Sequence, residues 1–109
     1  MDPVLLSDEE TIEVITKMGA DDVMVNHLVA DNGTKMVFVA FFRKGGCGRI
    51  YTNVCTYLGK RYKDEKIVVL ESPRLDKPCF KARERKPGNN KHFSKIPVPV
   101  HVTEEMLGV

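Results

Sequence analysis

The chain has 109 residues, of which 42% are hydrophobic and 29% charged, a composition typical of one folded domain rather than a disordered chain. No apolar run approaches the length of a membrane span, and the first ten residues lack the basic and apolar segments of a secretory signal. We therefore expect a cytoplasmic protein with no membrane partner.

The formal net charge of +2 hides an uneven distribution along the chain. Residues 1–31 carry a net charge of −7 and residues 32–109 carry +9. Such asymmetry favours binding to nucleic acid or to an acidic protein surface. The eight acids of the first part, which stand against the single base Lys17, are Asp2, Asp8, Glu9, Glu10, Glu13, Asp21, Asp22 and Asp31.

The first predicted element is an amphipathic helix that starts after Ser7 and ends before Gly19. Ser7 and Glu10 fit a capping box, in which each side chain accepts a hydrogen bond from the other residue's backbone amide. An apolar stripe with helical spacing runs from Ile12 to Met18. Gly19 can adopt the left-handed conformation that commonly follows a helix.

A β-hairpin is predicted next, from two apolar runs at Val23–Ala30 and Met36–Phe42. Asn32-Gly33 between them favours a type I′ turn, which needs positive φ at both residues. The second run is apolar on both faces and is therefore predicted to be a central strand. Either a helix or a second subunit, in a possible homodimer, then covers one set of its side chains: Val37, Val39 and Phe41.

The glycine-rich segment 43–49 interrupts the second strand. Its glycines and the cations Arg43, Lys44 and Arg49 are suited to an anion cradle, in which backbone amides approach an oxyanion near a helix start. The segment matches neither a Walker A loop nor a dinucleotide-binding fingerprint. The alternative is a flexible turn whose glycines supply positive φ.

Residues 49–58 fit two periods. Apolar residues recur at helical spacing, yet they also alternate, and the Tyr, Thr and Val content favours a strand. Because glycines lie before and after the segment, we predict a helix that Gly59 could end.

The rest of the chain reads as a short strand among irregular segments. Residues 60–66 are a charged connection, and Ile67–Leu70 is a buried strand. Residues 74–95 contain several Pro, Gly and Asn residues, so little regular structure is expected there. Ile96–Val102 alternates with prolines and predicts an edge strand or an extended strap, and 103–108 could form one helical turn.

The basic segment Arg74–Lys95 is the strongest candidate site. Cations can hold phosphates, and the rings of Phe80 and Phe93 can stack on unpaired bases, so the segment suits RNA or single-stranded DNA. The alternative is a solvated loop whose two phenylalanines are anchored in the core. With the three cations of segment 43–49, the predicted binding residues are Arg43, Lys44, Arg49, Arg74, Lys77, Phe80, Lys81, Arg83, Arg85, Lys86, Lys91, Phe93 and Lys95.

Metal or thiol chemistry has weak support. The residues that could provide it lack the paired, closely spaced ligands of a zinc site. Cys47 lies near cations that would activate a thiol, but nothing nearby supports a catalytic pairing. No metal, cofactor or catalytic residue is predicted. The residues concerned are Cys47, Cys55, Cys79, His27, His92 and His101.

Together these elements predict a single α+β domain over residues 1–109. Its architecture would be two-layered, a mainly antiparallel sheet of three to four strands with one or two helices packed on it. We predict a small non-catalytic binding protein, most simply for RNA or single-stranded nucleic acid. The alternative is a small phage-type accessory protein that inhibits or modulates a cellular protein, using the acidic helix and the basic segment as two contact faces.

Overall fold

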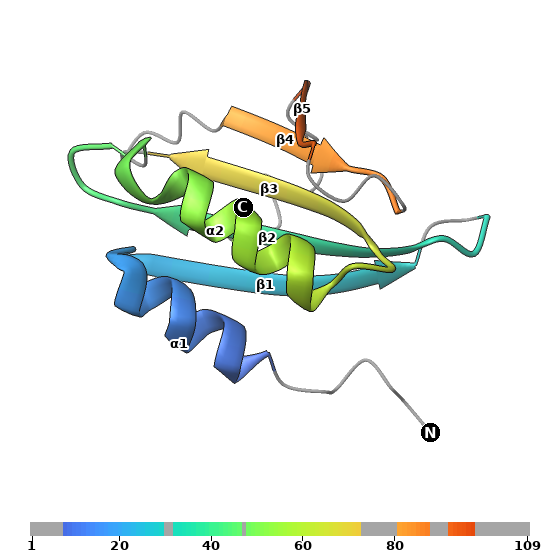
Figure 1. The fold of residues 1–109 in the computed structure, drawn as a ribbon, viewed down its shortest axis with the longest axis horizontal. Helices are drawn as coiled ribbons and strands as arrows, with labels where there is room; N and C mark the ends of the chain where they lie inside the picture. Colours follow the sequence, from blue (N-terminus) through green and yellow to red (C-terminus); the bar gives the residue numbers. More distant parts are fainter. Residues whose placement is uncertain (1–7, 30–31, 47, 73–80, 88–91, 98–109) are drawn as a thin grey trace, which may run out of the picture.

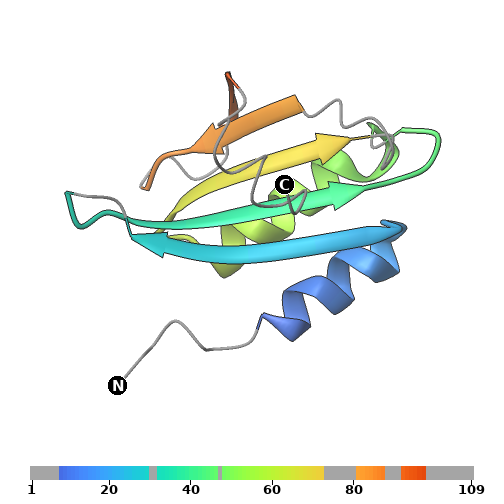
Figure 2. The same ribbon diagram turned by 180° about the vertical axis from the view of Figure 1, so that it is seen from behind.

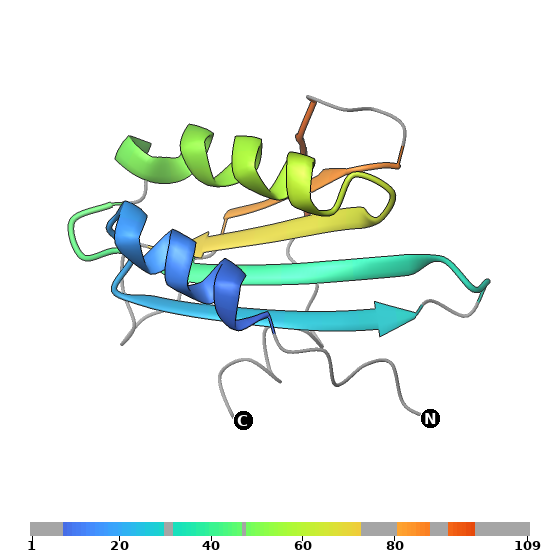
Figure 3. The ribbon, with the colours of Figure 1, turned by 60° about the horizontal axis from the view of Figure 1, so that its bottom comes forward.

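Two helices and five strands follow one another in a computed structural model that describes residues 8–29, 32–46, 48–72, 81–87 and 92–97. Both helices lie on one face of a single sheet (Figure 1; Figure 3). Neither described helix has the length and apolar content needed to cross a membrane. The elements are α1 (Glu9–Met18), β1 (Asp22–Val29), β2 (Lys35–Phe42), α2 (Gly48–Arg61), β3 (Lys66–Ser72), β4 (Lys81–Arg85) and β5 (Ser94–Ile96).

The predicted hairpin is confirmed, because β1 and β2 pair antiparallel from Asp22↔Phe42 to Val29↔Lys35. The predicted type I′ turn is wrong. Of Asn32 and Gly33, only the glycine has a positive φ, at 85°. The Asn32 side-chain oxygen instead accepts a hydrogen bond from the Thr34 amide at 3.0 Å, a local closure that needs no left-handed asparagine.

The segment with two competing periods is a helix, and α2 runs past Gly59 to Arg61. This helix carries the chain back across the sheet, so that β3 pairs parallel with β2. The other three strand pairs are antiparallel, in the order β1-β2-β3-β4-β5. The mainly antiparallel α+β fold is therefore confirmed, with five strands where three to four were predicted.

Part of the segment expected to be irregular is also strand. Lys81–Arg85 pairs with β3, and Ser94–Ile96 pairs with β4 at the sheet edge. The charged sequence concealed β4 because a strand beside a buried neighbour is selected by its pairing rather than by its own propensity. The predicted extended segment at Ile96–Val102 lies largely outside the described residues, as does the predicted turn at 103–108.

The core has two layers, one on each face of β2 (Figure 2 shows the face opposite the helices). Alternation sends Val37, Val39 and Phe41 toward the helices, which settles the sequence alternative in favour of helix packing. Phe38 and Ala40 belong to a second apolar cluster on the other face. Residues from the two helices and β3 complete the helix-side layer: Ile15, Val54, Leu58, Ile67 and Val69.

Helix α1 starts one residue later than predicted. Its N-cap is Asp8, whose side chain makes no capping bond, so the capping box centred on Ser7 is wrong. The Asp8 carboxylate instead bonds His27 and Tyr62, partners that are distant in sequence. Gly19 ends the helix at φ 122°, as predicted.

Candidate functional site

A broad groove of about 830 Å³ runs along α2, beside strand β4. Helix α2 lies over β2 and β3, so that β4 and β5 lie to one side of the helix axis (Figure 1). No carboxylate is among the described residues that line the groove, although four of its lining residues are basic. The lining residues are Tyr51, Thr52, Cys55, Thr56, Gly59, Lys60, Lys63, Arg83, His92 and Phe93.

One wall of the groove is an exposed face of α2. Thr52, Thr56, Lys60 and Lys63 recur at intervals of three or four residues and so share one exposed face of the helical segment and the turn after it. Both lysines are exposed and form no ion pair with a described residue. This wall therefore presents two ammonium groups and two hydroxyls to the groove.

The β4–β5 pair supplies the opposite wall. Arg83 pairs with Val69 of the helix-side core, so Arg83 points to the same face as α2. Lys95 is opposite Arg83 in the register and therefore lies on this face too. The strand pairing thus brings together two predicted binding residues that are twelve positions apart in sequence.

An arginine–tyrosine stack lies between the two walls. The Arg83 guanidinium carbon lies 4.2 Å from the centre of the Tyr51 ring, a distance that favours cation–π attraction. Burial raises the pKa of the Tyr51 hydroxyl and raises the pKa of the neighbouring Cys55 thiol to about 11. Both groups are therefore neutral at physiological pH, and the charge of the stack is the charge of Arg83.

Phe93 adds a second ring to the groove. It is half-buried, packs against the helix-side core and also lines the groove. The core anchor predicted from the sequence is confirmed for Phe93, and its ring also borders the groove. Phe80, the other predicted ring, lies outside the described residues, as do Arg74, Lys77 and Lys91.

The glycine-rich segment forms a separate basic hollow. Arg43, Lys44, Arg49 and the adjacent glycines line it at the start of α2, and it shares no lining residue with the groove. Two hydrogen-bond donors of this hollow already have partners within the chain. The Arg43 guanidinium donates to the Gly46 carbonyl at 2.8 Å, and Asp21 accepts the Lys44 amide at 2.7 Å.

Arg85 does not belong to any exposed surface. Its side chain is fully buried, although it was predicted to bind a ligand. The guanidinium donates to the carbonyls of Gly59 at 2.8 Å, Tyr62 at 2.7 Å and Glu65 at 3.1 Å. These carbonyls lie at and just beyond the end of α2, where helix carbonyls lack partners of their own. Arg85 therefore has a structural role.

Lys81 and Lys86 are exposed, but neither lines the groove. Lys81 starts β4 and has the same strand parity as Arg83, so it extends the basic face beyond the groove. Lys86 follows the strand. The acids of α1 are on the far side of α2 from β4 (Figure 1), and Glu10 pairs with Arg61 rather than with a groove cation.

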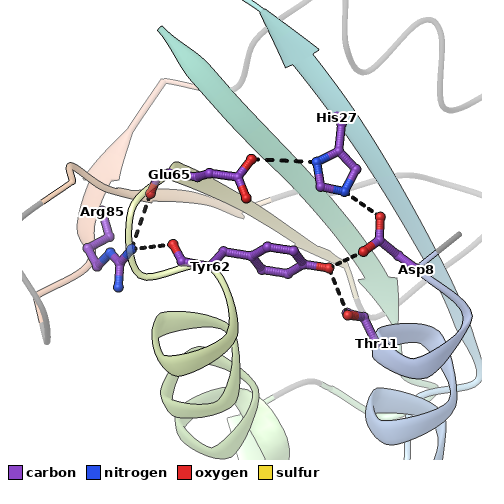
Figure 4. Close-up of polar contacts among 6 residues, drawn as sticks. All are labelled: Asp8, Thr11, His27, Tyr62, Glu65 and Arg85. Atoms are coloured by element: carbon purple, nitrogen blue, oxygen red, sulfur yellow. Dashed lines mark hydrogen bonds and ion pairs between the residues drawn. The ribbon is translucent and has the colours of Figure 1, made fainter. Parts of the chain in front are cut away.

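A second polar cluster joins the start of α1 to the end of α2 (Figure 4). The Tyr62 hydroxyl donates to Asp8 and accepts from the Thr11 hydroxyl at 2.8 Å. One His27 nitrogen bonds Asp8, and the other lies 3.6 Å from a Glu65 oxygen. These contacts link α1, β1 and the turn that follows α2.

Sequence reasoning missed Tyr51, Lys60, Lys63 and His92 as groove residues. The helical spacing of the two lysines with the threonines was a usable signal, but only contact with β4 makes that face a wall. Within the described ranges, no three His, Cys, Asp or Glu side chains are arranged to hold a metal ion. Cys55, the described cysteine, is buried with a free thiol.

Comparisons with known proteins returned no match to a family model, to a curated protein or to a solved structure.

Proposed function

We propose that this chain is a small non-catalytic binding protein that takes single-stranded nucleic acid, RNA or single-stranded DNA, into the groove between α2 and β4. The proposal rests on one observation, which is that positively charged side chains and aromatic rings line the same groove. Lys60, Lys63 and Arg83 share the groove with Phe93 and Tyr51, and no described carboxylate lines it. Cations hold a phosphate backbone, and rings stack on unpaired bases.

The described binding residues fall into two sets under this proposal. Arg83 and Phe93 line the groove, and Lys95 and Lys81 extend its basic face. The hollow of Arg43, Lys44 and Arg49 is a separate place where a long strand could continue. A reducing, cytoplasmic compartment fits this use, because the Cys55 thiol is free.

The test is fluorescence anisotropy with a labelled single-stranded 12-mer, RNA or DNA, over a range of salt concentrations. The variant K60A/K63A removes two groove cations, and K17A/K35A removes two exposed cations from α1 and β2. If each groove lysine neutralises one phosphate, the slope of log affinity against log salt falls by about 1.4 in K60A/K63A. The control variant keeps the wild-type slope.

Base stacking is tested separately with F93L, which keeps apolar bulk in the core but removes the ring. We expect the affinity to fall at least about fivefold while the salt slope stays unchanged, because stacking carries no counterion release. A double-stranded 12-mer should bind more weakly than the single strand, since its bases are already stacked. Equal affinities for the two forms, with no effect of F93L, would contradict the proposal.

A second candidate is an accessory protein that inhibits or modulates a cellular protein, in the manner of small phage-type regulators. The observation that favours it is Ile12, which is 37% exposed among the acids of α1. This alternative predicts one protein partner that remains bound after nuclease treatment. That partner should be lost with I12D and retained with K60A/K63A.

A further inference from the structure

Arg83 and Arg85 lie on the same face of β4, yet their donors are used differently. Arg85 is fully buried and donates to three backbone carbonyls. Arg83 makes no hydrogen bond and no ion pair with any described residue, and the buried Nε of each arginine is without a partner. The two arginines therefore differ at their terminal Nη groups, which donate to carbonyls in Arg85 but bond no described residue in Arg83. Because a buried or half-buried guanidinium rarely leaves its donors unused, Arg83 is the one of the two that calls for an external acceptor.

The guanidinium of Arg83 is nevertheless held in place. It lies 4.2 Å above the Tyr51 ring, and the ring is fixed on the first turn of α2. Stacking restrains a flat guanidinium without using its in-plane N–H donors, so the Nη groups of Arg83 keep their capacity to donate to a ligand. A planar donor group that is fixed before the ligand arrives loses less freedom on binding than a lysine does.

The surroundings of Arg83 favour an anion with several oxygens. Lys60, Lys63 and His92 line the same groove, and Lys95 is paired opposite Arg83 on the neighbouring strand. Glu71 is buried, and burial raises its pKa while the charge of Arg83 acts to lower it, but the two side chains make no ion pair. The positive charge is therefore not cancelled by a carboxylate in contact.

We propose that Arg83 is the phosphate anchor of the groove, with Tyr51 as the residue that positions it. The two Nη groups of Arg83 donate to two oxygens of one phosphate and so fix where the nucleic-acid backbone crosses β4. Lys60, Lys63 and Lys95 contribute charge without a fixed geometry. This inference rests on the proposed function, because it names the group of the nucleic acid that the groove recognises.

The experiment compares variants that keep the charge but change the geometry. R83K retains a cation but loses the flat, stacked donor group, and Y51L removes the ring beneath it. R61K is the matched control, because Arg61 also lies over a tyrosine, Tyr62, at 5.6 Å, but away from the groove.

The probes are the labelled single-stranded 12-mer and inorganic pyrophosphate, followed by anisotropy and by NMR shifts. We expect R83K and Y51L each to weaken 12-mer binding about tenfold, with R61K within twofold of wild type. The double variant R83K/Y51L should lose little beyond either single change, since both remove the same contact. Thermal melts establish that each variant is folded.

The outcomes separate the two proposals. If the wild type binds the 12-mer and R83K binds as tightly as R61K, Arg83 is not the anchor and the proposed function stands. If the wild type does not bind the 12-mer, the proposed function fails. Pyrophosphate binding that depends on Arg83 would then still support a phosphate anchor, and its absence would overturn the inference as well.

Discussion

Replacing Arg85 by alanine removes the buried group that joins β4 to the end of α2. Three hydrogen bonds from a charged donor are lost, each worth about 1.5–3 kcal/mol. Relief of the cation's desolvation, several kcal/mol, offsets part of this loss, and burial does lower the pKa of the guanidinium. A net destabilisation of about 3 kcal/mol remains, because three carbonyls lose their donor and the side chain leaves a void.

Thermal unfolding by circular dichroism measures this loss. For a domain of this size, about 3 kcal/mol corresponds to a melting temperature lower by roughly 12 °C. R85K should fall between wild type and R85A, because one ammonium cannot reach three carbonyls that a guanidinium spans. Hydrogen exchange at the Tyr62 amide, which donates to Leu58 at 2.9 Å, should speed up in both variants.

The matched control is K86A, which removes an exposed cation at the next position of the chain. It should change stability by less than about 0.5 kcal/mol, as surface substitutions generally do. A loss of about 1 kcal/mol would lower the melting temperature by roughly 4 °C. If R85A melts within that range of K86A, the three hydrogen bonds to carbonyls do not stabilise the fold, and the reasoning is refuted.

Two further predictions concern buried ionisable groups. Burial raises the pKa of Glu71, so its contribution to stability is full below about pH 4.5 and is lost as the pH rises through the raised value. E71Q should therefore raise the melting temperature at pH 7.5 but not at pH 4, and an equal shift at both values would contradict this. Burial also raises the pKa of Cys55 to about 11. In a C47S/C79S background its thiol should react with Ellman's reagent at pH 8 only upon unfolding, and rapid native reaction would count against it.

The helices and the hairpin were predictable because each has a local signal. The apolar spacing of α1 and the two β-rich runs around Asn32-Gly33 identify these elements without reference to the rest of the chain. For α2 the spacing fits a helix or a strand, and the glycines on either side favour the helix. Strand β4 has no such signal, since four of the five residues in Lys81–Arg85 are charged. Its pairing with β3 is a tertiary event that no short window of sequence contains.

The same limit applies to the candidate site. Arg83 and Arg85 are equivalent in the sequence, two arginines on one face of a strand. They differ only because the end of α2 lies above Arg85 and the Tyr51 ring lies beneath Arg83. The sequence therefore shows that the segment is basic. The role of each cation on β4 depends on which part of α2 packs against it.

Strand β4 joins the basic side chains to a hydrogen-bonded sheet, and Arg85 links that sheet to a helix of 14 residues. A ligand bound as proposed, between α2 and β4, would meet backbone that is already ordered. Its association should therefore carry a small entropic penalty for the protein. Calorimetry should accordingly show a modest heat-capacity change, without the large negative value of a segment that folds on binding.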